Sequence, residues 1–397
     1  MKINTVKQMI NLNYFKVSKN QRESFFQIFL IVFVFTLVII FSFYFGSFSK
    51  QSLSTSNKIS SEITEIKTTT NPSVQAKLYR QLIERVGPAE AQDDLLNSGL
   101  PFTGQTHLLN HVVGDFLYEK FGTKGLAQCK DYFLSSCYHG FILHVIADKG
   151  IEGVKETFNE CLKFGPTVYS QCAHGIGHGF LASVGYKNLT LALDTCDKVG
   201  KAIKEFPLFN CYDGVFMENI WAVHEGVPSP DRWVKPGDIL YPCNDPRINS
   251  KYITACWSNQ PSLIYQFYKG DVKKVGQNLC LPLTNPEYQR MCFDGLSRQI
   301  HPLTQGSSTK TLSLCGLMPN SKWKNFCVGV NASASYAVGD HNVPFKICAE
   351  VSEDGKGECY ERIFGIAKAY SKTSTDFKLE CNKVTEQSWK EQCLSMQ

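Results

Sequence analysis

The sequence predicts an all-α protein, an α-solenoid of about seven to eight helix-hairpin repeats of roughly 35 residues, preceded by one transmembrane helix. Three observations predict this fold. All sixteen cysteines follow residue 128 in eight close pairs, and the second members of the pairs recur every 32 to 45 residues. The intervals between them read as helical hairpins. Near the N-terminus, residues 25–46 form an uncharged apolar run.

The apolar run at 25–46 (FFQIFLIVFVFTLVIIFSFYFG) is long enough to cross a hydrocarbon core of about 30 Å as a transmembrane helix. A cleavable signal peptide is the alternative, but its apolar region would be shorter, about 7 to 15 residues, and would end in a small-residue cleavage site. Basic residues are concentrated in 1–24, which the positive-inside rule makes a cytoplasmic head. We therefore expect a single-pass membrane protein that contacts lipid through one span, with everything after residue 47 extracytoplasmic.

Two segments separate the span from the repeats. Residues 47–72 are polar and Ser/Thr-rich, with too little apolar material for a core, and are predicted to be a flexible stalk. Residues 73–103 carry apolar residues at helical spacing, with Pro88 at a helix start and Gly99 at a stop, which predicts a capping helical hairpin. Residues 104–397 would then form the helical-repeat ectodomain.

Each repeat is predicted to contain a longer helix A and a shorter helix B. Helix A carries a cysteine one or two turns in, often with glycine three residues later, and helix B follows a Gly or polar turn and ends in the next cysteine. Glycine lowers helix propensity but lets a helix approach its neighbour closely. We expect this role for four glycines of helix A: Gly140, Gly175, Gly214 and Gly295.

An even, regularly spaced set of cysteines outside the cytoplasm is normally a disulfide framework. No CxxC motif occurs, so zinc-ribbon, thioredoxin and covalent haem sites are excluded. The cysteine ending helix B can pair with the next helix A, as in Cys280–Cys292, or helices A and B of one repeat can be joined, as in Cys292–Cys315. The second scheme leaves Cys129 and Cys393 unpaired. We therefore favour the first, with the pairs Cys129–Cys137, Cys161–Cys172, Cys196–Cys211, Cys243–Cys256, Cys280–Cys292, Cys315–Cys327, Cys348–Cys359 and Cys381–Cys393.

In period, helix pairing and cysteine placement, residues 104–397 resemble the Sel1-like and tetratricopeptide α-solenoids. The likeness is greatest to their secreted subgroup, in which a disulfide ties helix B to the following helix A. The small-residue and aromatic consensus of those repeats is not well matched. The resemblance implies the fold and a protein or peptide partner on the concave face, and it carries over no functional residue.

Histidines are concentrated in the first repeats, with six of nine between residues 107 and 178. Counted from the repeat cysteine, His139, His174 and Asp213 all stand at position plus two. His107 takes the same place if Gln105 stands for the missing cysteine. Four successive helices A thus carry paired candidate ligands in register: His107 with His111, His139 with His144, His174 with His178, and Asp213 with Glu218.

The spacing within each pair decides whether both members share a helix face. His107/His111 and His174/His178 are i,i+4 pairs, which place both imidazoles on one face, as in HExxH metal sites. The other two pairs are i,i+5, so their members lie about 140° apart and need not reach one ion. Later repeats lose these residues, so we expect any chemistry in the N-terminal half. His301 and His341 are isolated and are interpreted as structural.

This register predicts a His/carboxylate centre for a transition metal, with zinc or iron favoured. The ligand number leaves room for two ions, and catalysis through a metal-activated water stays open. A hydrogen-bonded histidine ladder that only locks the repeats together is one alternative. The other is a cell-surface protein-interaction scaffold without metal or catalysis.

One repeat is irregular. Residues 226–246 contain five prolines where helix B should stand, which lengthens the interval from Cys211 to Cys243. Long insertions in compact repeats often bind ligands or close over sites. We predict a lid or recognition loop with Trp233 and Tyr241 as ligand contacts, and a plain surface insertion is the alternative.

Other searches are negative. The net charge of +5 forms no Lys/Arg stripe, which argues against a nucleic-acid partner. GxSxG, P-loop, GxGxxG and EF-hand motifs do not occur.

Overall fold

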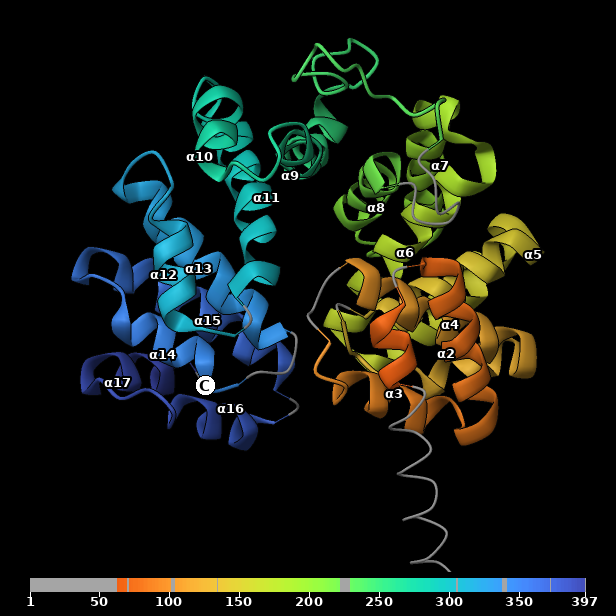
Figure 1. The fold of residues 1–397 in the computed structure, drawn as a ribbon, viewed down its shortest axis with the longest axis horizontal. Helices are drawn as coiled ribbons and strands as arrows, with labels where there is room; N and C mark the ends of the chain where they lie inside the picture. The colour runs from red at the N-terminus through yellow and green to blue at the C-terminus, as the bar shows by residue number, and fades with distance from the viewer. Residues whose placement is uncertain are drawn as a thin grey trace, which may run out of the picture. The chain divides into compact units, whose positions relative to one another are not determined.

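The computed structural model describes residues 63–69, 71–100, 104–133, 135–221, 229–304, 306–337, 341–371 and 373–396. Within these ranges regular structure is helical and no strand occurs, which confirms the all-α prediction (Figure 1). The predicted cytoplasmic head and the span at 25–46 lie outside the described residues. None of the helices that are described combines the length and apolarity that crossing a membrane requires.

The folded body begins within the segment predicted to be a stalk. Residues 63–68 are helical and Ile66 is fully buried. The side-chain amide of Gln75 donates a hydrogen bond of 2.9 Å to the carbonyl of Ile66, which joins this segment to the next helix. That helix is α2 (Pro72–Val86), and α3 (Pro88–Leu96) follows it. The two helices form the hairpin expected of residues 73–103.

The helices A pack against one another in chain order. Each contacts the next helix A of the series: α4 (Gly104–Phe121), α5 (Ser136–Cys161), α6 (Pro166–Val184), α8 (Leu208–Trp221), α9 (Ser250–Phe267), α11 (Pro286–Thr304), α13 (Ser321–Ala337) and α15 (Glu353–Tyr370). Helix α5 is divided at Gly150, whose φ of 58° and ψ of −145° are not helical. Its first part is therefore a helix A and its second part a helix B.

Short helices occupy the positions of helix B. They are η1 (Gly122–Gln128), α7 (Leu189–Ala202), α10 (Val272–Val275) with η4 (Gly276–Cys280), α12 (Ser308–Cys315), α14 (Val343–Glu350) and α16 (Ser374–Cys381), and α17 (Gln387–Ser395) follows them. Two short turns, η2 (Leu162–Phe164) and η3 (Tyr186–Asn188), connect helices. Between α8 and α9 the described residues form turns, as expected for the insertion.

All sixteen cysteines are joined in disulfides, and the scheme linking helix B to the next helix A is confirmed at every pair. The alternative, in which Cys292 pairs with Cys315, is wrong, because Cys292 is bonded to Cys280 and Cys315 to Cys327. The eight disulfides are Cys129–Cys137, Cys161–Cys172, Cys196–Cys211, Cys243–Cys256, Cys280–Cys292, Cys315–Cys327, Cys348–Cys359 and Cys381–Cys393.

The first three disulfides lie close to the candidate ligands. Their second cysteines belong to α5, α6 and α8, two residues before His139, His174 and Asp213 respectively. A covalent link therefore fixes each of these helices about half a turn from its candidate ligand. The insertion is tied in the same way, because Cys243 at its end is bonded to Cys256 of α9.

Glycine sets the distance between the first helices A. A Cβ atom on Gly140 would lie 2.2 Å from the carbonyl oxygen of His111, and one on Gly214 would lie 2.0 Å from that of His174. No other residue fits at such separations. Each of these glycines directly follows a residue at position plus two, so the helices approach closely beside the candidate ligands.

Candidate metal centre

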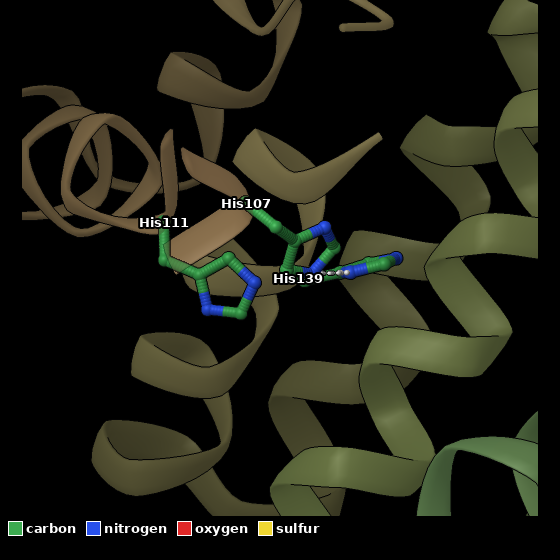
Figure 2. A group of neighbouring side chains, drawn as sticks. All are labelled: His107, His111 and His139. Carbon is green, nitrogen blue, oxygen red and sulfur yellow. Dashed lines mark hydrogen bonds between the residues drawn. The ribbon is translucent and has the colours of Figure 1, made fainter. Parts of the chain in front are cut away.

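His107 and His111 of α4 meet His139 of α5. One ring nitrogen of each lies within 4.8 Å of one nitrogen of both others, and Figure 2 shows the three side chains gathered between the two helices. The ring centroids are 4.8, 5.3 and 5.8 Å apart. His111 and His139 are buried, whereas His107 is half-buried. The structure thus brings three of the eight predicted ligands to a common point.

A backbone carbonyl fixes the tautomer of His107. Its Nδ1 lies 2.8 Å from the carbonyl oxygen of Phe133. A carbonyl only accepts hydrogen bonds, so Nδ1 carries the proton and Nε2 keeps its lone pair. That Nε2 lies 3.4 Å from Nδ1 of His139. A histidine whose outer N–H donates to a carbonyl while its inner nitrogen is left as a ligand is the usual arrangement at metal sites.

The carbonyl that holds His107 belongs to a strained loop. Phe133 has a φ of 52° and Ser135 a φ of 58°, both in the left-handed region that favours glycine. Such residues cost about 1–3 kcal/mol each and are concentrated at functional sites. The loop is closed by the Cys129–Cys137 disulfide, which constrains the strained segment.

His139 is the most enclosed member of the group. Burial lowers its pKa well below the ordinary value, and the neighbouring imidazoles lower it further. It is therefore a neutral imidazole at pH 7, the form that binds metal. Its Nε2 is buried and has no hydrogen-bond partner among the residues that the structure describes. Figure 2 shows this nitrogen pointing away from His107 and His111.

His174 and His178 of α6 face carboxylates of α8. Nδ1 of His174 lies 3.2 Å from an oxygen of Asp213, and Nδ1 of His178 lies 2.8 Å from an oxygen of Glu218. The hydroxyl of Tyr186 donates to the other oxygen of Glu218 over 2.5 Å. All these side chains are buried. The two carboxylates thus orient both imidazoles through the Nδ1 atom of each ring.

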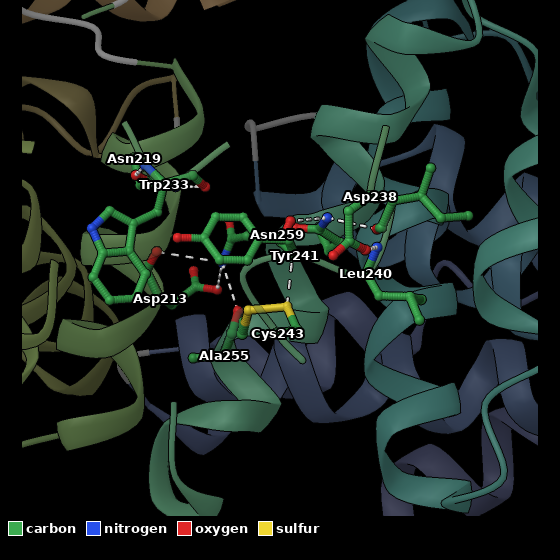
Figure 3. The surroundings of a disulfide bond; sticks show 12 residues. Asp213, Asn219, Trp233, Asp238, Leu240, Tyr241, Cys243, Ala255 and Asn259 are labelled. Atoms are coloured by element: carbon green, nitrogen blue, oxygen red, sulfur yellow. Dashed lines mark hydrogen bonds between the residues drawn. A yellow bond between two sulfur atoms is a disulfide. The ribbon is translucent and has the colours of Figure 1, made fainter. Parts of the chain in front are cut away.

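Asp213 is held as an anion. Burial alone raises the pKa of this carboxyl, but the hydrogen bond from His174 and the charge of Arg298 outweigh it and bring the pKa to about 2. The side-chain amide of Asn259 also donates to Asp213 over 2.7 Å, as Figure 3 shows. A permanent negative charge therefore stands behind the imidazole of His174.

His144 does not join the others. Its Nδ1 lies 3.6 Å from the carboxylate of Asp115, which raises the pKa of His144. Its ring lies beside that of Tyr118, at 5.0 Å. The i,i+5 spacing turns this side chain away from His139 on the same helix, because five residues span well over one turn.

The two residues proposed for the lid are packed rather than projecting. Trp233 is 7% exposed, and its indole N–H donates to the carbonyl of Lys187. The side chain of Asn219 hydrogen-bonds both the N–H and the C=O of Trp233. Tyr241 is equally buried and stacks near the Trp233 ring, at 6.1 Å (Figure 3). The segment is fastened to α8, and its role as a lid stays a prediction.

Three hydrogen-bond partners of the candidate residues were not anticipated from the sequence: the Phe133 carbonyl, Tyr186 and Asn259. The first depends on a left-handed backbone in a loop, for which the sequence offers no glycine as a signal. The other two are supplied by η3 and α9, outside the positions counted from the cysteines. Only their packing against the helices that bear the site reveals them.

No protein-family model matches the chain, and neither a curated protein nor a solved structure does. The likeness to Sel1-like and tetratricopeptide repeats therefore rests on helix pairing and cysteine spacing alone.

Proposed function

We propose that the chain is a membrane-anchored, extracytoplasmic α-solenoid that binds a transition-metal ion at His107, His111 and His139. The observation that carries the proposal is the convergence of three imidazole nitrogens within 4.8 Å. The hydrogen bond from Nδ1 of His107 to the carbonyl of Phe133 supports the proposal, because it leaves a lone pair on Nε2, the nitrogen that faces His139.

The ligand set suits an ion that keeps an exchangeable position. Three imidazoles leave the fourth tetrahedral position for water or substrate, as in catalytic rather than structural zinc sites. The half-buried His107 gives the ion a side nearer to solvent. Neutral imidazoles accept zinc, iron, copper and nickel, and we propose zinc or iron. Such an ion is suited to activating a bound water.

The placement outside the cytoplasm is supported by the disulfides. Eight disulfides in one chain are typical of an oxidising compartment. The apolar run at 25–46, with its basic head, supports anchoring with the C-terminal body outside. The sequential packing of helices A, each tied to the preceding helix B, supports the solenoid.

The test is metal content. The full-length chain, purified in detergent with its disulfides formed, is incubated with Zn²⁺ or Fe²⁺, desalted and assayed by mass spectrometry. We expect at least one bound ion per chain, one ion fewer in His111→Ala, and no change in His341→Ala, whose side chain lies beside Glu380. A wild-type chain that takes up no metal, and whose melting temperature ignores chelator, would overturn the proposal. That result would favour the interaction scaffold.

A further inference from the structure

The pair His174 and His178 presents an electrostatic problem. Their Nδ1 atoms face the carboxylates of Asp213 and Glu218, which accept hydrogen bonds, so the protons lie on Nδ1 and both Nε2 atoms keep lone pairs. These two Nε2 atoms lie 3.0 Å apart in a buried site. Two lone pairs at that distance repel each other unless a cation lies between them. The cation is either a shared proton or a metal ion.

The imidazole of His139 lies next to this pair. His139 is 1% exposed, and its partnerless Nε2 points away from His107 and His111. Its ring centroid lies 5.2 Å from that of His174 and 5.9 Å from that of His178, which are themselves 4.8 Å apart. The corresponding separations in the first group are 5.3, 5.8 and 4.8 Å. Two nearly equal triangles of imidazoles therefore share His139.

The repeat geometry explains the duplication. A Cβ atom on Gly175 would lie 3.1 Å from Cα of His139, so α6 packs on α5 at the point where Gly140 packs α5 on α4. Each i,i+4 pair of histidines then meets the same imidazole from one side. His139, with a nitrogen on each edge of its ring, is the residue able to serve both.

We propose that His139 bridges two metal ions. Its Nδ1 binds one ion together with His107 and His111, and its Nε2 binds the other together with His174 and His178. This inference deepens the proposed function and rests on it. Binding both ions requires the remaining N–H proton of His139 to leave to solvent, so that the ring bridges as imidazolate. Asp213 and Glu218 hold the outer nitrogens of the second pair, as carboxylates do behind metal-bound histidines.

The two ions would differ in access. The second site is formed by side chains that are 1% to 7% exposed, whereas the first includes the half-buried His107. The first ion is then the one placed to exchange a ligand, and the second fixes the bridge and adds positive charge behind it. This makes the assembly a dinuclear centre with one reactive ion.

Copper is the probe that reports the bridge directly. The full-length chain is loaded with one and then two equivalents of Cu²⁺, bound copper is measured, and the electron paramagnetic resonance signal is integrated. Two Cu²⁺ ions joined by imidazolate couple antiferromagnetically. We therefore expect the spin count to fall well below the bound copper at two equivalents. Two bound ions with a full spin count would overturn the bridge.

Variants separate the two sites. We expect His107→Ala and His178→Ala each to retain one ion and His139→Ala to weaken both, while His341→Ala retains two. Circular dichroism identifies any variant that fails to fold, and the wild-type spin count stands independently of the variants. If the chain binds only one ion, and this ion is lost in His107→Ala but kept in His178→Ala, the second site is refuted. The cation shared by His174 and His178 is then a proton, and the proposed function is unaffected. No bound ion at all would refute both.

Glu218 provides a finer test as a positioning residue. Glu218→Gln keeps an oxygen that can accept from His178 but removes the charge, so we expect the affinity for the second ion alone to fall about 10–100-fold. The matched control is Glu380→Gln, because Glu380 also faces a histidine, His341, at 3.3 Å. Equal effects of both variants, or weakening of the first ion by Glu218→Gln, would contradict this role.

Discussion

At the scale of single residues, the buried histidines differ in the groups that surround them. His139 lies among other imidazoles, whereas His301 of α11 lies with its Nε2 3.2 Å from the hydroxyl of Ser335. Burial lowers the pKa of His301 to about 4 from an ordinary value of 6.5. This supports the interpretation of His301 as structural, because a buried neutral imidazole costs stability when it must be protonated.

His301 should contribute to acid sensitivity. The unfolded chain binds a proton here below pH 6.5 and the folded chain only below about 4, so the stability that His301 provides is complete above pH 6.5 and is lost as pH falls to about 4. The difference amounts to roughly 3 kcal/mol at most. We expect His301→Gln to flatten the dependence of the unfolding free energy on pH in this window, measured by denaturant titration with chelator present. An unchanged slope would contradict the prediction.

The candidate ligands could be predicted at this scale, but their roles could not. Counting from the cysteines found His107, His139 and His174, because a fixed offset on equivalent helices is a local property. It did not distinguish ligands from the residues that orient them. Asp213 and Glu218 contact the Nδ1 atoms of His174 and His178 and so orient these rings. This role is set by the direction of the two carboxylate side chains on a neighbouring helix.

At the scale of helices, the site depends on how closely helices A approach. The interhelical distance is set where glycine removes the Cβ atom, and the ring nitrogens of His107 and His139 are 3.4 Å apart as a result. Helix formation and pairing follow from sequence periodicity. The breaks in helices depend on local backbone, such as that at Gly150 within α5.

A methyl group at Gly140 should separate α4 from α5. Gly140→Ala places Cβ against the backbone of His111, and overpacking of this kind costs about 1–3 kcal/mol. We expect lower stability together with weaker metal binding, measured by thermal unfolding and metal content. The control is Gly365→Ala in α15, where nothing lies within 4 Å of the added atom. That change should stabilise by about 0.5–1 kcal/mol. Wild-type metal affinity in Gly140→Ala would argue against this role.

At the scale of the whole molecule, the disulfides repeat the same link along the chain, but only the first few adjoin the candidate centre. In the proposed solenoid, stability is approximately a sum of local terms, so equal links should contribute equally wherever they lie. We expect metal binding, in contrast, to depend only on the disulfides that adjoin the candidate centre.

Two disulfides test this division. Cys161–Cys172 and Cys348–Cys359 each span 11 residues, and all four cysteines are fully buried. Replacing either pair by alanine should cost about 3 kcal/mol in the chain-entropy model. Only the first pair anchors α6, the helix that carries His174, so only its removal should lower metal content. Equal metal loss in both variants would show that the centre depends on overall stability rather than on the local link.

The sequence by itself determined the helical class and the register of the histidines and favoured the observed disulfide pairing, because all three depend on spacing along one chain. The tertiary structure decided which side chains meet. It turned His144 toward Asp115, brought the Phe133 carbonyl to His107 through a left-handed loop, and set His139 between two pairs of imidazoles. Those outcomes depend on helix rotation and on the close approach that glycine permits, and neither is fixed by residue spacing alone.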